Sequence, residues 1–98
     1  MINETLIRHD ITKLLRDLIA IPSTYPPGNT IKICKYIEKW YAQLGYRCQT
    51  LSCEESVHNL VAAIGSGSPK LVFNCHVDTV GTGPISKWKS NPFAATSK

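Results

Sequence analysis

The residues best suited to chemistry in this chain are His76 and Asp78, which follow the apolar run Leu71 to Phe73. Residues two apart in an extended backbone point to the same side, so the imidazole and the carboxylate would leave the end of a strand together. Such a neighbour suits a metal-binding histidine, because one ring nitrogen binds the metal while the other donates its N–H to an acidic partner. An ordinary histidine followed by a turn-capping aspartate has the same pattern, so the pair alone leaves both interpretations open.

A first helix is predicted from Glu4 to about Ala20, because its apolar residues are spaced by three and four. Asn3 is placed to cap it, and the helix should end near Ile21, since the residue before a proline disfavours the helical conformation. The loop from 22 to 28 follows. Its Ser23 and Thr24 are interpreted as polar loop residues without a catalytic role.

A second helix is predicted from Asn29 or Thr30 to Gly45, where a glycine can adopt the left-handed conformation that ends many helices. Its apolar residues fall on one stripe and are interpreted as core: Ile33, Ile37, Trp40, Tyr41 and Leu44.

Three strands are predicted next, over residues 46–51, 59–64 and 70–75. The continuous apolar run of the second strand predicts burial on both faces. The five-residue turn after it predicts a hairpin between the second and third strands. Residues after Asp78 have little periodicity and are predicted to form a long loop, held to the domain by Trp88 and Phe93. Helices and strands together indicate an α/β fold.

Composition limits the classes of function. The chain has 98 residues, 43% of them apolar, which is enough for one small domain. Its net charge of +4 comes from scattered basic residues, which argues against a nucleic-acid surface. No apolar run approaches the length needed to span a membrane. The four cysteines form no C-x-x-C pair, and no secretory signal is recognised, so a reduced, cytoplasmic setting is expected.

The segments LVFNCHVD, from Leu71, and TVGTGPISKWKSNPFAAT, from Thr79, resemble the co-catalytic zinc amidohydrolases. This family includes succinyl-diaminopimelate desuccinylase, acetylornithine deacetylase, aminoacylases and carboxypeptidase G. The upstream segment IPSTYPPGN is also similar to the family, and the desuccinylase branch is the most similar. Two residues depart from the family pattern: Cys75 stands where glycine is usual, and Gly81 where proline is usual. A side chain at position 75 would crowd the metal pocket or offer it a thiolate. The matching positions are His76, Asp78, Val80, Trp88, Pro92 and Phe93.

The resemblance implies that residues 1–98 are the amino-terminal portion of a catalytic domain with a zinc-exopeptidase-like, three-layer α/β/α fold. In that fold the three strands belong to a mixed sheet, and a downstream strand lies between the second and third. The lid or dimerisation domain is expected to be absent. The bridging aspartate, the other metal ligands and the glutamate base are expected beyond Lys98.

The activity implied is metal-dependent hydrolysis of the amide of an N-acyl amino acid, with N-succinyl-diaminopimelate as the expected substrate. Acetylornithine or another substrate of the related aminoacylases and carboxypeptidases is the alternative. By resemblance His76 binds one of two zinc or cobalt ions, and Asp78 is the catalytic residue that orients it. The full-length enzyme is expected to be a homodimer.

This chain alone is expected to be inactive and to bind metal weakly. The rival prediction from another class is a non-catalytic interaction module that dimerises through a sheet edge or by swapping.

Overall fold

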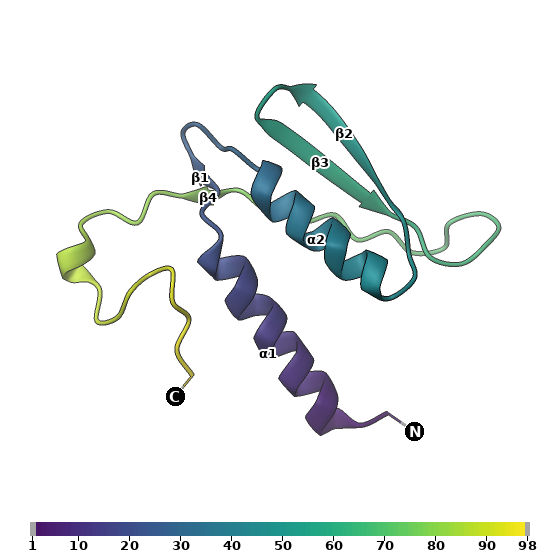
Figure 1. The fold of residues 1–98 in the computed structure, drawn as a ribbon, viewed down its shortest axis with the longest axis horizontal. Coiled ribbons are helices and arrows are strands. Elements are labelled where there is room, and N and C mark those ends of the chain that lie inside the picture. The colour runs from purple at the N-terminus through teal and green to yellow at the C-terminus, as the bar shows by residue number, and fades with distance from the viewer. Residues whose placement is uncertain (1, 98) are drawn as a thin grey trace. The chain divides into compact units, whose positions relative to one another are not determined.

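A computed structural model describes residues 2–97, except for the side chain of Cys53. These residues form two compact units, one joining 2–22 to 82–97 and the other comprising 23–81. The described residues contain two α-helices, one parallel strand pair and one antiparallel pair (Figure 1). The α/β class predicted from the sequence is therefore confirmed. No helix of the described residues is long and apolar enough to cross a membrane.

The first unit contains helix α1, Glu4–Ala20, with the bounds that its apolar spacing predicted. The side-chain oxygen of Asn3 accepts a hydrogen bond from the Leu6 N–H at 3.2 Å, which satisfies one of the donors left free at a helix start. Ile21 has an extended conformation, with φ −96° and ψ 107°, as expected before a proline. The predicted N-terminal cap and the predicted end of α1 are both confirmed.

The apolar stripe of α1 is not buried, although its periodicity is clear. None of the helix residues is buried, and Leu6 and Ile11 are each 60% exposed. Helix periodicity is set by local sequence, whereas burial needs a partner surface from elsewhere. The helix therefore forms although its apolar face is only partly covered.

The long loop of the first unit carries one 3-10 turn, η1, over Ile85–Lys87. The indole N–H of Trp88 donates to the carbonyl of Thr82 at 2.9 Å, so this hydrogen bond stays within the loop. The prediction that Trp88 holds the loop to the rest of the domain is not supported by this bond. Near the other end, Arg16 donates to the Ser97 hydroxyl at 2.7 Å and connects the loop to α1.

Helix α2, Ile31–Gln43, lies beside the antiparallel pair in the second unit (Figure 1). Gly45 follows it with φ +86°, so the predicted left-handed end is confirmed. Ile33 is 5% exposed and belongs to the core, and the rings of Trp40 and Tyr41 meet edge to face at 5.2 Å. Leu44 is the exception to the predicted stripe, being 54% exposed.

The antiparallel pair is β2, Cys48–Glu54, with β3, Val57–Ala62. Cys48 pairs with Ala62, and an irregularity between Ser52 and Glu54 shifts the register near the turn. The hairpin that the residues alone suggest between the second and third strands is wrong, because residues 70–75 do not form a strand. The tight turn at 55 and 56 joins the first two strands. Burial of the second strand on both faces is also wrong. Its side chains alternate, because α2 covers only one face and leaves Val61 47% exposed.

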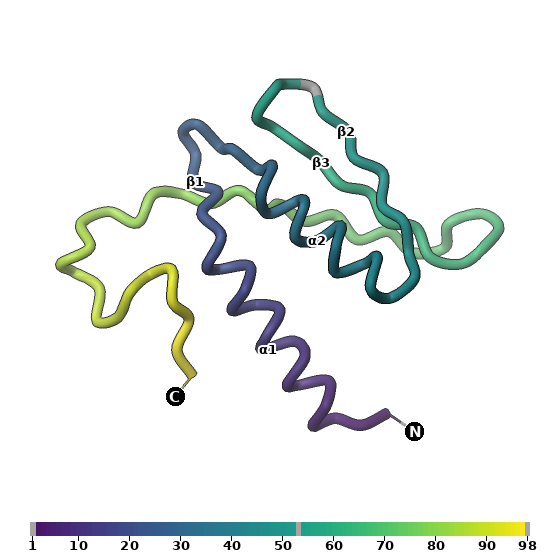
Figure 2. Tube along the Cα trace, in the orientation of Figure 1, coloured from purple at the N-terminus to yellow at the C-terminus, as the bar shows by residue number. Residues whose placement is uncertain are grey.

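The predicted third strand, residues 70–75, is wrong as well. This segment has no strand structure, and Leu71, Val72 and Phe73 are 73%, 78% and 85% exposed. Among the described residues no strand pairs with it, and an extended run without interstrand hydrogen bonds is not a strand. The segment continues along the chain to β4, Thr79–Val80 (Figure 2). Strand β4 pairs in parallel with β1, Thr24–Tyr25. Both short strands fall in segments predicted to be loops.

Thr30 connects α2 to β3. Its side chain is almost buried, at 4% exposure, and its hydroxyl both accepts from the His58 N–H and donates to the His58 carbonyl, each at 2.8 Å. The Cys34 thiol donates to the same carbonyl at 3.3 Å. Burial raises the pKa of Cys34, and the hydrogen bond with Thr30 offsets part of that rise, so the thiol stays protonated near neutral pH.

Replacing Thr30 by valine should lower the free energy of unfolding by about 2 kcal/mol. The shape is kept, but the His58 N–H loses its acceptor in a partly buried place. Urea denaturation followed by circular dichroism measures the change. Thr50→Val, on an exposed position of β2, is the matched control and should change it by less than about 0.5 kcal/mol. Equal effects of the two variants would contradict the role given to the Thr30 hydroxyl.

Candidate functional site

The structure brings the two predicted site residues into contact. The Nδ1 atom of His76 lies 2.8 Å from the backbone carbonyl oxygen of Asp78 and 3.5 Å from its carboxylate oxygen Oδ1. Both side chains are open to solvent, at 85% and 51% exposure. A carbonyl oxygen only accepts hydrogen bonds, so Nδ1 carries the proton in this contact. The lone pair of the neutral ring is then on Nε2, the nitrogen that remains for a metal.

The closer partner of the imidazole is the backbone of Asp78, not its carboxylate. The family resemblance implies that the carboxylate orients the ring, but the carboxylate contact is the longer of the two. A backbone carbonyl orients a metal-binding histidine in the same way as an acidic side chain. The ring orientation at this site therefore depends first on the backbone path from 76 to 78.

Ser23, interpreted from the sequence as a loop residue without a catalytic role, contacts the residues on both sides of Asp78. Its side chain is buried, at 3% exposure, and its hydroxyl donates to the Val77 carbonyl at 2.6 Å. Its own carbonyl accepts from the Thr79 N–H at 3.0 Å, where β1 and β4 begin to pair. These contacts join residues more than fifty positions apart, so no local pattern could have revealed them. The single available signal was that Ser23 lies in a segment that resembles the family.

The described residues do not contain a complete metal site. Nowhere in 2–97, the Cys53 side chain aside, do three histidine, cysteine or acidic side chains come together. One imidazole with a neighbouring carboxylate supplies fewer ligands than the three or four that hold zinc in proteins. His76 fits the place of one ligand, because its side chain is exposed and its Nδ1 is already hydrogen-bonded.

The two departures from the family pattern have different structural settings. The Cys75 thiol is free and exposed, and it joins no metal-binding cluster in the described part of the chain. At Gly81 an added Cβ would meet nothing within 4 Å, and the backbone is not left-handed there. Glycine is therefore not sterically required at position 81.

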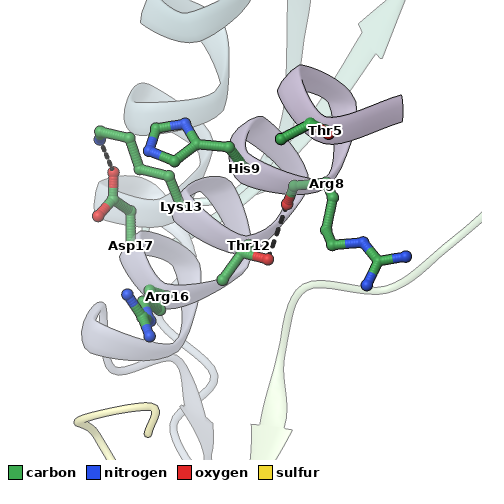
Figure 3. A pocket seen from close by; sticks show the side chains of 7 residues that line it. All are labelled: Thr5, Arg8, His9, Thr12, Lys13, Arg16 and Asp17. Atoms are coloured by element: carbon green, nitrogen blue, oxygen red, sulfur yellow. Dashed lines mark hydrogen bonds and ion pairs between the residues drawn. The ribbon is translucent and has the colours of Figure 1, made fainter. Parts of the chain in front are cut away.

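Other polar groups do not extend the site. Glu54 and Glu55 are exposed at the hairpin turn between β2 and β3. A shallow depression lies along α1 and includes neither His76 nor Asp78 (Figure 3). Its lining comes entirely from that helix: Thr5, Arg8, His9, Thr12, Lys13, Arg16 and Asp17.

Comparison with known proteins shows which proteins this chain is similar to. No family model matches the chain, and no solved structure gives a significant match. The chain is 40% identical over 89 residues to the succinyl-diaminopimelate desuccinylase of Legionella pneumophila strain Lens, a match covering 91% of this chain and 23% of the relative. The chain is related in sequence to the succinyl-diaminopimelate desuccinylases. The desuccinylase of Ehrlichia canis strain Jake is 38% identical over 88 residues, which is 87% of this chain and 23% of the relative. The desuccinylase of Bordetella avium strain 197N is 36% identical over 88 residues, which is 90% of this chain and 22% of the relative.

The desuccinylase relationship confirms the resemblance found in the sequence. A continuous match of 89 residues in a chain of 98 must include residues 10–89, and so Ser23, His76 and Asp78. The chain spans 23% of the length of the Legionella desuccinylase.

Proposed function

We propose that this chain supplies one metal ligand, His76, and the residue that orients it, Asp78, to a metal-dependent desuccinylase acting on N-succinyl-diaminopimelate. The observation that carries the proposal is the His76–Asp78 contact, which leaves Nε2 available in a segment that matches desuccinylases. The proposed metals are two zinc ions, or cobalt. The proposed setting is a cytoplasmic homodimer whose catalytic domain has a three-layer α/β/α fold, with residues 1–98 as its amino-terminal portion.

The residues of this chain have a binding and orienting role in the proposed reaction. A metal held by Nε2 of His76 would polarise the amide carbonyl and lower the pKa of a bound water to about 7. The Asp78 carbonyl keeps the ring in one orientation by accepting the Nδ1–H. The Asp78 carboxylate, at 3.5 Å, stabilises the positive charge that the imidazole gains when Nε2 donates electrons.

A chimera tests the proposal. Residues of this chain replace the matching 89 residues of the Legionella desuccinylase, and the purified chimera is assayed on N-succinyl-diaminopimelate and on N-acetylornithine. We expect hydrolysis of the succinyl substrate with a kcat/KM at least about tenfold higher than that for the acetyl substrate. Faster hydrolysis of acetylornithine would favour the deacetylase alternative. A chimera that folds, binds zinc and hydrolyses neither amide would contradict the proposal.

The 98-residue chain alone should bind zinc weakly and hydrolyse no amide. One imidazole provides a small part of the coordination that zinc needs, so we expect a dissociation constant on the order of 1 mM. Isothermal titration calorimetry measures it, with His76→Ala as the variant that should lose this binding. Stoichiometric micromolar zinc binding together with amide hydrolysis by the chain alone would overturn this expectation.

A second candidate function, from another class, is a non-catalytic module that associates with a second copy of itself. The exposed apolar run 71–73 favours it, because a strand-like segment without a partner can pair with the same segment of another copy. Val72→Lys should then abolish a dimer seen by sedimentation velocity over a concentration series. Ile64→Lys, at an apolar position 62% exposed outside the run, should not. A wild-type chain that stays monomeric throughout would reject this candidate.

A further inference from the structure

We infer that Ser23 is a positioning residue of the candidate site, and that its contacts with Val77 and Thr79 select the Nδ1–H form of His76. The inference rests on the proposed function in one respect, since it is that function which makes Nε2 the nitrogen of interest. The contacts themselves are properties of residues 23–81 and need no metal.

Ser23 holds the peptide units on both sides of Asp78. Its hydroxyl donates to the carbonyl of Val77, the residue before, at 2.6 Å. Its carbonyl accepts the N–H of Thr79, the residue after, at 3.0 Å. With one residue bound at two points, the Asp78 peptide is restrained in both position and rotation. We call this pair of hydrogen bonds the Ser23 clamp.

The clamp is needed because the segment has little other support. His76 and Asp78 are exposed and lie outside regular secondary structure, and β4 begins only at Thr79. The hydroxyl of Ser23 donates to the carbonyl of the peptide that joins Val77 to Asp78. Ser23 itself is 3% exposed, so its hydroxyl is shielded from competing water.

The clamp has a consequence for proton placement on the ring. An exposed neutral imidazole can carry its proton on either nitrogen, and the hydrogen bond made by one nitrogen decides which form is populated. The Asp78 carbonyl, held 2.8 Å from Nδ1, favours the form with the proton on Nδ1. Without the Ser23 hydroxyl the segment keeps only the bond from the Thr79 N–H to the Ser23 carbonyl, so the geometry between ring and Asp78 carbonyl is less restrained.

The test is the tautomer of His76 in the 98-residue chain, measured by long-range nitrogen–proton NMR at about pH 9. The wild type should be mainly in the Nδ1–H form. Ser23→Ala should lower the population of that form about twofold or more, and Ser23→Thr, which keeps a hydroxyl, should retain it. Because neither metal nor turnover is involved, failure of the proposed enzyme function leaves this result unchanged.

A matched control is Ser52→Ala. It removes a serine hydroxyl that donates to a backbone carbonyl, that of Glu54, at the similar distance of 2.7 Å, away from the site in sequence. It should leave the His76 tautomer unchanged. The amide signals of β2 and β3 report whether each variant is folded. Should Ser23→Ala lose them, Ser23→Cys takes its place, because a thiol of similar size is a weaker donor.

Three outcomes would overturn the inference. The first is a wild type mainly in the Nε2–H form, and the second is a folded Ser23→Ala or Ser23→Cys variant with the wild-type tautomer ratio. The third is an equal change in Ser52→Ala, which would indicate general loosening of the unit. The inference is supported if Ser23→Ala lowers the population of the Nδ1–H form while Ser23→Thr and Ser52→Ala keep it.

Discussion

His76→Ala in the chimera with the Legionella desuccinylase is expected to lower kcat/KM for N-succinyl-diaminopimelate by about a thousandfold or more. In the proposed site His76 is the ligand that this chain contributes, and its ring is already oriented by the 2.8 Å contact with Asp78. A metal acting on a carbonyl supplies several kcal/mol of transition-state stabilisation, and each loss of about 1.4 kcal/mol reduces the rate tenfold. Metal content measured on the same sample should fall with the activity.

His9→Ala is the matched control. His9 is also an exposed histidine beside an acidic residue, with Nδ1 3.5 Å from the Asp10 carboxylate, the same distance as in the His76–Asp78 pair. It lies on α1 and takes no part in the proposed site. Its replacement should change kcat/KM by less than about twofold. A His76→Ala chimera with near wild-type activity and metal content would remove His76 from the metal site.

Asp78→Ala is expected to lower zinc affinity or kcat/KM of the chimera by about 10- to 100-fold. The effect is smaller than that of His76→Ala for a structural reason. The closer contact to the ring comes from the backbone carbonyl, which any substitution at 78 retains. What the variant removes is the carboxylate at 3.5 Å and its negative charge. Asp78→Asn should lie between the wild type and Asp78→Ala.

Asp10→Ala controls for the loss of a carboxylate beside an exposed histidine. It should be indistinguishable from the wild-type chimera in metal affinity and in kcat/KM. If Asp78→Ala also matched the wild type, the orienting role would belong to the backbone alone, and Asp78 would no longer be a catalytic residue. If Asp78→Ala equalled His76→Ala, the carboxylate would have to bind the metal directly.

Helices were predictable here because their signals are local. The start and end of α1 follow from Asn3 and from Ile21 before a proline, and the end of α2 follows from Gly45. Each of these signals acts within one turn of the helix. How far each helix is buried could not be predicted from local signals. Several apolar residues of α1 are exposed, and so is Leu44 at the end of α2.

Strand pairing was predicted poorly, because it depends on residues far apart in the sequence. The apolar run 70–75 has strand-like composition, yet no strand of the described residues pairs with it. The parallel contact of Thr24 with Thr79 joins two segments without any strand signal. Composition indicates which segments can be strands, whereas the presence of a neighbouring backbone decides which of them are.

The candidate site divides in the same way. The candidate pair His76 and Asp78 and the relation to the desuccinylases could be found in the amino-acid order, because a spacing of two and a motif are properties of neighbouring residues. The folded chain was needed to show that the Asp78 carbonyl is the closer partner of the ring and that Ser23 bonds to the peptides around it. Backbone groups are the same in nearly every residue, so the residue types do not show which backbone groups pair. The contact between Ser23 and Val77 joins residues 54 positions apart and forms only when the chain has folded.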